Sequence, residues 1–149
     1  MCYITQSFIV LINESRLELI NTYDGNDKEL PFYWWNIISK SRNVKVGKIS
    51  FRIGNNYHSY YNGNIGYEVD EEYRGNHYAL QVCRMMPDIA KYYGMDHIHL
   101  TCDFDNVASY KTVEKLGAKL LEEVQPPEDY VFYYEGMPRQ RIYELKISG

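Results

Sequence analysis

The stretch from Glu68 to Ala79 constrains the fold of this chain most, because the spacing of apolar residues changes within it. Residues 64–70 alternate as a half-buried strand does, whereas helical spacing begins at Ala79. The connection between the two patterns is short and acidic and contains the pair Arg74-Gly75. The sequence therefore predicts a strand that passes through a tight turn directly into a helix.

This turn has the features of an anion-binding site. The first backbone amides of a helix have no partner within the helix and lie at the positive end of its dipole. Gly75 allows an anion to approach the main chain, and Arg74 adds a fork of donors. Two interpretations stay open at this point: a cradle for a pyrophosphate, or an ordinary strand-to-helix turn with a solvated arginine.

The composition indicates one globular domain that spans residues 1–149. Hydrophobic residues make up 45% of the chain and aromatic residues 15%, which is enough for a single core. The net charge of −4 argues against nucleic acid as a partner and suits an amine-bearing substrate better. The apolar run Phe8–Ile12 is too short to span a bilayer and no export signal is visible, so we expect no membrane partner.

The cysteines and histidines also bear on location and chemistry. Cys2, Cys83 and Cys102 form no Cys-x-x-Cys pair and leave one thiol unpaired in any disulfide scheme, which favours a reducing, cytoplasmic location. His97 and His99 share one face of a predicted strand. With no third ligand nearby in the sequence, we expect no metal.

The pattern of short apolar runs predicts an α+β fold that begins as an antiparallel meander. Alternating or β-branched runs predict strands at residues 8–12, 17–23, 33–39, 44–53, 64–70, 98–102, 118–124 and 141–147. A slip in the alternation near Gly47 predicts a bulge, and residues 54–63 are predicted to be a turn region.

Two helices are predicted in the second half of the chain. The first runs from Asn76 to Gly94, with a kink at Pro87 because proline frees a carbonyl in the preceding turn. The second is capped by Asn106 and ends at Gly117. Residues 125–138 are predicted to form a long loop.

Two blocks of the chain resemble the GNAT superfamily of N-acetyltransferases. Residues 65–79 are similar to the fourth strand and pyrophosphate-binding motif of that family, which reads Arg or Gln, two residues, Gly, one residue, then Gly or Ala. Arg74 and Ala79 match its ends, whereas His77 stands where Gly is expected. Residues 106–118 resemble the Asn-x-x-Ser…Glu-Lys-Leu-Gly-Phe signature of the subgroup related to RimJ and RimL.

The resemblance implies a mixed, mostly antiparallel twisted sheet with helices on both faces and a splayed central strand pair. The helix pair that usually follows the first strand would be reduced, because few residues separate Tyr23 from Tyr33. The implied activity is direct transfer of an acetyl group from acetyl-CoA, without a metal, to the primary amine of a peptide N-terminus or a small molecule. The alternative is a non-catalytic CoA-binding regulatory domain, and a homodimer is possible in either case.

The resemblance also implies which residues bind CoA. Tyr67 and Val69 would contact the pantetheine arm through their main chains, as an added strand does. The pyrophosphate would lie against the turn, on Arg74, Gly75, Asn76, His77, Tyr78 and Ala79. Asn106 would hydrogen-bond the pantetheine arm, and the helix that contains Ser109 would lie alongside the CoA.

For catalysis, Glu68 is the candidate general base or amine-orienting carboxylate, with an ion pair to a neighbouring Lys or Arg as the alternative. In many family members the general acid is a tyrosine at the position where this chain has Val113. Tyr110, one turn earlier, is the candidate general acid, with simple packing as the alternative. Residues 129–136 combine aromatic rings and carboxylates, which suits an acceptor-side lid over an amine or a self-packed loop.

Overall fold

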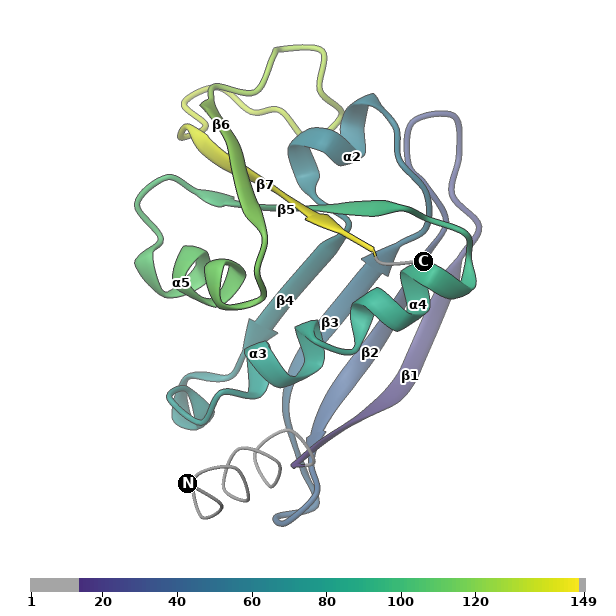
Figure 1. Ribbon diagram of the computed structural model, residues 1–149, viewed down its shortest axis with the longest axis vertical. Coiled ribbons are helices and arrows are strands. Elements are labelled where there is room, and N and C mark those ends of the chain that lie inside the picture. The colour runs from purple at the N-terminus through teal and green to yellow at the C-terminus, as the bar shows by residue number, and fades with distance from the viewer. Residues whose placement is uncertain (1–13, 148–149) are drawn as a thin grey trace.

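The computed structural model describes residues 14–147, which form two antiparallel sheets that part from each other (Figure 1). The strand order is β1-β2-β3-β4 in the first sheet and β5-β7-β6 in the second. The strands are β1 Ser15–Tyr23, β2 Phe32–Ser39, β3 Val44–Arg52, β4 Ile65–Val69, β5 His97–Asp103, β6 Lys119–Val124 and β7 Gln140–Lys146. The predicted strands from residue 17 onward are confirmed, and the strand expected at 8–12 lies outside the described residues.

The first sheet is the predicted meander, and it contains the predicted bulge. The β2–β3 register shifts where Ile37 faces Gly47 and Ile38 faces Lys45, so Val46 is the extra residue. A Cβ atom at Gly47 would overlap the carbonyl oxygen of Glu68 on β4. Glycine at this position therefore lets β3 and β4 approach closely and fixes the backbone at Glu68.

Two short helices, α3 Tyr78–Cys83 and α4 Met86–Tyr92, lie across one face of the first sheet (Figure 1). Their buried residues Val82, Cys83 and Met86 join the core with residues of β2 and β3. The predicted kink at Pro87 is a complete break, because Pro87 lies in the first turn of α4, where its missing N–H costs no helical bond.

Residues 57–62 correct the sequence prediction, because they form helix α2 (Tyr57–Asn62) and not a turn. The helix starts with a reciprocal capping box: Asn56 Oδ1 accepts from the Ser59 amide at 2.7 Å, and Ser59 Oγ accepts from the Asn56 amide at 2.8 Å. The helix was not predicted because its residues, mostly tyrosines, show no helical spacing of apolar side chains.

The last helix and the long loop agree with the prediction. Helix α5 (Val107–Lys115) is capped by Asn106, whose Oδ1 accepts from the Ser109 amide at 3.2 Å, and its Val113 is buried in the core. The β1–β2 connection, residues 24–31, contains no helix, so the expected reduction of the first helix pair is confirmed. Across residues 14–147, no helix is long and apolar enough to cross a membrane.

Candidate functional site

The fully buried Asn64, which directly precedes β4, joins the first sheet to the second by hydrogen bonds. Its amide donates to the His99 carbonyl at 2.7 Å, and its Oδ1 accepts from the His99 amide at 2.8 Å. Its Nδ2 donates to the carbonyls of Arg52 at 3.0 Å and Gly54 at 2.7 Å. Beyond this apex no strand among residues 14–147 pairs with the second edge of β4, so a gap opens between β4 and β5 (Figure 1). Sequence analysis missed Asn64, because only the fold brings its partners together.

The edge of β4 that faces the gap carries main-chain groups that no strand among residues 14–147 pairs with. The Asp70 amide donates to the Val46 carbonyl, and main-chain groups of alternate residues point to the same side of an antiparallel pair. The main-chain N–H and C=O groups of Glu68 therefore point toward β3, whereas those of Tyr67 and Val69 point into the gap. These are the two residues predicted to pair with a pantetheine arm.

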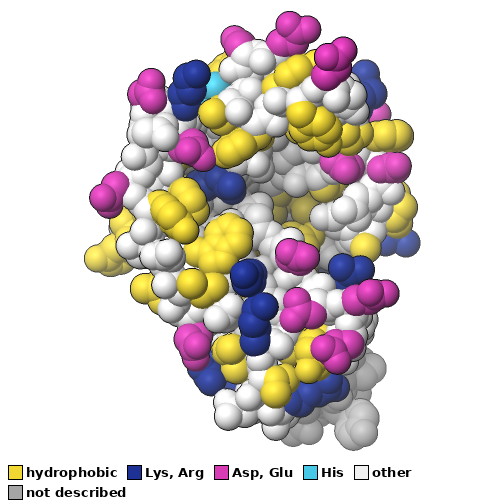
Figure 2. Space-filling model, turned by 180° about the vertical axis from the view of Figure 1, so that it is seen from behind, with side chains coloured by type: hydrophobic (Ala, Val, Ile, Leu, Met, Phe, Trp, Pro, Cys, Tyr) yellow, Lys and Arg dark blue, Asp and Glu magenta, His cyan; other side chains and the backbone are white. Residues whose placement is uncertain are grey.

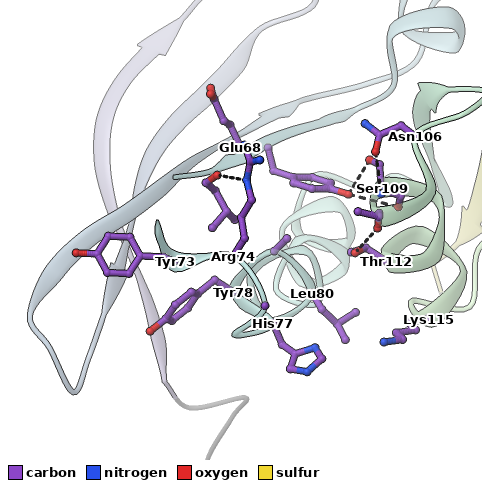
Figure 3. Close-up of a pocket in the computed structure, with 15 residues that line it drawn as sticks. Glu68, Tyr73, Arg74, His77, Tyr78, Leu80, Asn106, Ser109, Thr112 and Lys115 are labelled. Atoms are coloured by element: carbon purple, nitrogen blue, oxygen red, sulfur yellow. Dashed lines mark hydrogen bonds between the residues drawn. The ribbon is translucent and has the colours of Figure 1, made fainter. Parts of the chain in front are cut away.

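A cavity of about 430 Å³ lies along this edge (Figure 3). Its walls contain all predicted site residues except Asn76 and Tyr110. The residues that sequence analysis did not name are Tyr73, Leu80, Ala108, Thr112 and Lys115. β4 and the turn before α3 thus face α5 across one cavity.

The turn that closes the cavity presents unused donors. Within the described part of the chain, none of the amides of residues 75–80 donates a hydrogen bond. Gly75 has φ +87° and open space around the position of a Cβ atom. His77 adopts left-handed backbone, with φ 63° and ψ 21°, at the position where the motif expects Gly. The departure from the motif is therefore in the side chain and not in the backbone.

The side chains of Arg74 and Asn76 hold the turn in shape. Arg74 Nε donates to the Val69 carbonyl at 3.1 Å, so the guanidinium lies back over the end of β4 (Figure 3). Asn76 Nδ2 donates to the Tyr73 carbonyl at 2.9 Å, and the Asn76 carbonyl accepts from Gln81. Asn76 thus stabilises the turn from outside the cavity.

Tyr67 spans the gap and contacts the helix on its far side. Its hydroxyl lies 3.0 Å from Ser109 Oγ. Burial raises the pKa of Tyr67 to about 12, so the phenol is protonated at neutral pH. A proton-bearing hydroxyl pair therefore lies between β4 and α5, which sequence analysis did not predict because the contact depends on how far the strands part.

Glu68 and Tyr110, the two predicted catalytic residues, differ in placement. Glu68 is exposed, lines the cavity and points away from Arg74 (Figure 3), and no ion pair of its carboxylate occurs among residues 14–147. Tyr110 lies outside the cavity, with the Arg141 guanidinium 4.1 Å from its ring centre. The packing alternative describes Tyr110 better.

The described cysteines are buried free thiols. Burial raises the pKa of Cys83 to about 12 and that of Cys102 to about 11. Neither thiol forms an appreciable amount of thiolate at neutral pH, and the thiolate is the nucleophilic form. The site therefore suits chemistry without a covalent enzyme intermediate.

The loop that follows β6 is attached to α2. Tyr57 donates to Asp129 at 2.6 Å, and the Val131 amide donates to His58 Nδ1 at 3.0 Å. Tyr130 is buried and stacks on the His58 ring. The Tyr130 ring therefore packs on α2, and the Phe132 ring lies against Tyr130.

The family model of the GNAT acetyltransferase domain matches residues 9–119. Among solved structures, a GNAT-family acetyltransferase from Bacillus anthracis is 21% identical with a TM-score of 0.60, and the alignment covers 76% of this chain and 65% of that one. RimL, a ribosomal L7/L12 alpha-N-protein acetyltransferase solved with coenzyme A, is 23% identical with a TM-score of 0.62, over 78% of this chain and 62% of that one.

The microcin C7 self-immunity acetyltransferase MccE, solved with acetyl-CoA and AMP, is 21% identical with a TM-score of 0.60, over 98% of this chain and 69% of that one. At these identities the similarity is one of fold, and the chain spans less than two thirds of the B. anthracis and RimL structures. No curated protein matches the sequence significantly.

Proposed function

Because this chain belongs to the GNAT family of acetyltransferases, we propose that it transfers the acetyl group of acetyl-CoA directly to a primary amine. The observation that carries the proposal is the edge of β4. Its main-chain groups at Tyr67 and Val69, which no described strand pairs with, lead along the gap to a turn whose amides at residues 75–80 have no partner in the described chain.

Acetyl-CoA would lie along this edge. The pantetheine arm would pair with the main chain of Tyr67 and Val69 as an added strand, which fixes its register. The diphosphate would accept from the amides of residues 75–80, and Lys115 across the cavity would add positive charge. Arg74 would exchange the Val69 carbonyl for a phosphate oxygen, which frees that carbonyl for the arm.

The reaction would then proceed in one ternary complex. The ammonium form of the amine loses one proton to Glu68, directly or through a water, and the neutral nitrogen forms a bond to the thioester carbonyl carbon. As the C–S bond breaks, the sulfur takes up a proton from the Tyr67–Ser109 hydroxyl pair, and the second proton leaving the nitrogen restores that pair through water. The proton on Glu68 returns to solvent. Neither Cys83 nor Cys102 takes part, because burial keeps both thiols protonated.

Two observations bear on the class of acceptor. The name of RimL denotes an alpha-N-protein acetyltransferase, and that of MccE an acetyltransferase of self-immunity to microcin C7. The face seen from behind is hollowed near its middle, with acidic side chains among those around the hollow (Figure 2). We therefore propose either a peptide N-terminus or a small cationic amine as acceptor.

Release of free CoA thiol tests the function directly. Acetyl-CoA and the full chain are incubated with polyamines, amino acids, aminoglycosides and N-terminal peptides. Thiol release that depends on one amine class, with a matching acetylated product, supports transfer. Tight acetyl-CoA binding without release on any amine would favour the non-catalytic regulatory domain, and absence of binding would contradict both.

A further inference from the structure

We propose that His97, His99 and Glu144 form a binding site for a divalent transition metal of the zinc type. The site lies on the face of β5 opposite to its core residues Ile98 and Leu100, because successive strand residues point to opposite faces. It is independent of the acetyl-CoA gap. Sequence analysis expected no metal because it found no third ligand nearby, and the fold supplies Glu144 from β7.

The register of the second sheet brings the three side chains together. His99 lies directly opposite Glu144 in the β5–β7 pair, and His97 is two residues away on the same face. One candidate ligand atom from each residue lies within 4.8 Å of the others. His99 Nε2 is 3.6 Å from Glu144 Oε2. Zinc at about 2.0–2.1 Å from each of two ligands in a tetrahedron separates them by about 3.4 Å.

His99 lacks the hydrogen bonds that a buried imidazole needs. Its side chain is only 9% exposed, and its Nδ1 has no hydrogen-bond partner among the described residues. The 3.6 Å separation from Glu144 exceeds an ordinary N–H···O bond. A metal between Nε2 and the Glu144 carboxylate would pair these two groups, which lie too far apart for a hydrogen bond to each other.

His97 already has the outer contact of a metal-binding histidine. Its Nδ1 lies 2.6 Å from Asp96 Oδ1. A carboxylate that accepts from one ring nitrogen fixes the tautomer and leaves the other nitrogen, Nε2, with its lone pair for a metal. Two histidines and one glutamate leave a fourth position for water. Bound metal would link β5 to β7 beside the apex, since the main chain of His99 holds Asn64.

Two neighbouring lysines are expected to lower the affinity of this site for a metal ion. Lys146 lies opposite His97 in the β5–β7 register, and Lys119 lies opposite Glu144 in the β6–β7 register. Both ammonium groups oppose a cation, so we expect a metal that EDTA removes readily.

Zn²⁺ added to the metal-free, tag-free full chain tests the site by its effect on Tm. We expect Zn²⁺ to raise Tm in the wild type, and the rise to disappear in His97→Gln and Glu144→Gln. The matched control is His58→Gln, which removes a histidine outside the cluster and keeps an acceptor for the Val131 amide. In the control the rise should persist.

Co²⁺ provides a second readout that does not depend on stability. Cobalt held by nitrogen and oxygen ligands gives visible absorption without a thiolate charge-transfer band, and we expect this spectrum in wild type and its loss in His97→Gln. The proposal is overturned if Zn²⁺ leaves the wild-type Tm unchanged, if the rise survives both cluster variants, or if a thiolate band shows that cysteine binds the metal.

Discussion

His77 shows how a single residue can depart from a motif and keep its geometry. A histidine with φ 63° occupies backbone space that glycine enters without cost. The His77 side chain is exposed and makes no capping hydrogen bond to α3. The shape of the turn therefore depends on the backbone conformation at His77 and not on its imidazole. The pyrophosphate cradle that we propose therefore does not require the glycine of the motif.

Replacement of His77 tests whether its backbone or its imidazole matters. His77→Gly should leave the free energy of unfolding within about 1 kcal/mol of wild type, because relief of strain and added chain entropy oppose each other. His77→Val should be destabilised by at least about 1 kcal/mol, since a β-branched residue is strained at positive φ. Urea unfolding measures both, and calorimetry with acetyl-CoA measures affinity. A large loss of affinity in His77→Gly would mean that the imidazole itself binds phosphate.

Glu68 is the residue on which the proposed proton transfer depends. Glu68→Gln should lower kcat by about 100-fold or more and change acetyl-CoA affinity little, because a general base contributes about 10²–10⁴-fold to rate. Glu72→Gln, an exposed carboxylate outside the cavity, is the matched control and should behave as wild type. If Glu68→Gln keeps the wild-type kcat across the pH range, Glu68 has no part in the mechanism.

At the scale of elements, the gap exists because Asn64 joins β4 to β5 at one end only. The buried Asn64 side chain makes three hydrogen bonds at this junction. Gly63 allows the main chain before Asn64 to approach β5 closely. A Cβ atom at Gly63, which has φ +81°, would lie 3.0 Å from the Thr101 amide nitrogen. The splay of the sheet is thus built into a short segment before β4 and not into the strands themselves.

Removal of the Asn64 amide should destabilise this junction strongly. Asn64→Ala leaves two partly buried carbonyls and the buried His99 amide without this partner, and each such group costs about 1–3 kcal/mol. We expect a loss of at least about 3 kcal/mol in the free energy of unfolding. Asn55→Ala, at an exposed asparagine, should change it by less than about 0.5 kcal/mol. If the two substitutions changed the free energy of unfolding equally, Asn64 would not be the residue that stabilises the junction between β4 and β5.

Some elements could be predicted from the sequence and others could not, for physical reasons. Local signals predicted the alternation of Ile98, Leu100 and Cys102 on β5 and the cap at Asn106. Helix α2 was missed because its capping box precedes tyrosines with no apolar period. The Tyr67–Ser109 contact and the approach of Glu144 to His99 could not be predicted, because each requires the separation or register of strands distant in the chain.

At the scale of the whole molecule, one core joins the two sheets. Ile49 of the first sheet and Leu100 of the second belong to the same buried cluster, together with Val82 and Val113 from the helices. This continuity supports our proposal that residues 1–149 make up a single domain. If this proposal holds, the gap is a cleft within one cooperative unit, and we expect it to persist until the unit unfolds.

Buried tyrosines should make the stability of this unit fall at alkaline pH. Burial raises the pKa of Tyr67 and of Tyr130 to about 12, whereas an unfolded tyrosine has a pKa of about 10. Below about pH 10 both states are protonated and the stability is fully present; between about pH 10 and 12 only the unfolded state ionises, so stability falls. Urea unfolding across this range measures the loss. Tyr130→Phe should reduce it, whereas Tyr92→Phe, at a residue 82% exposed, should not.

Amide hydrogen exchange with and without acetyl-CoA tests the central claim most directly, because the claim assigns the ligand to particular main-chain groups. We predict that acetyl-CoA slows exchange at Tyr67, Val69 and residues 75–80, and that the β1–β2 hairpin exchanges as before. Saturating acetyl-CoA that leaves exchange at residues 67–80 unchanged, or slows it only elsewhere, would contradict the assignment of this gap as the acetyl-CoA site.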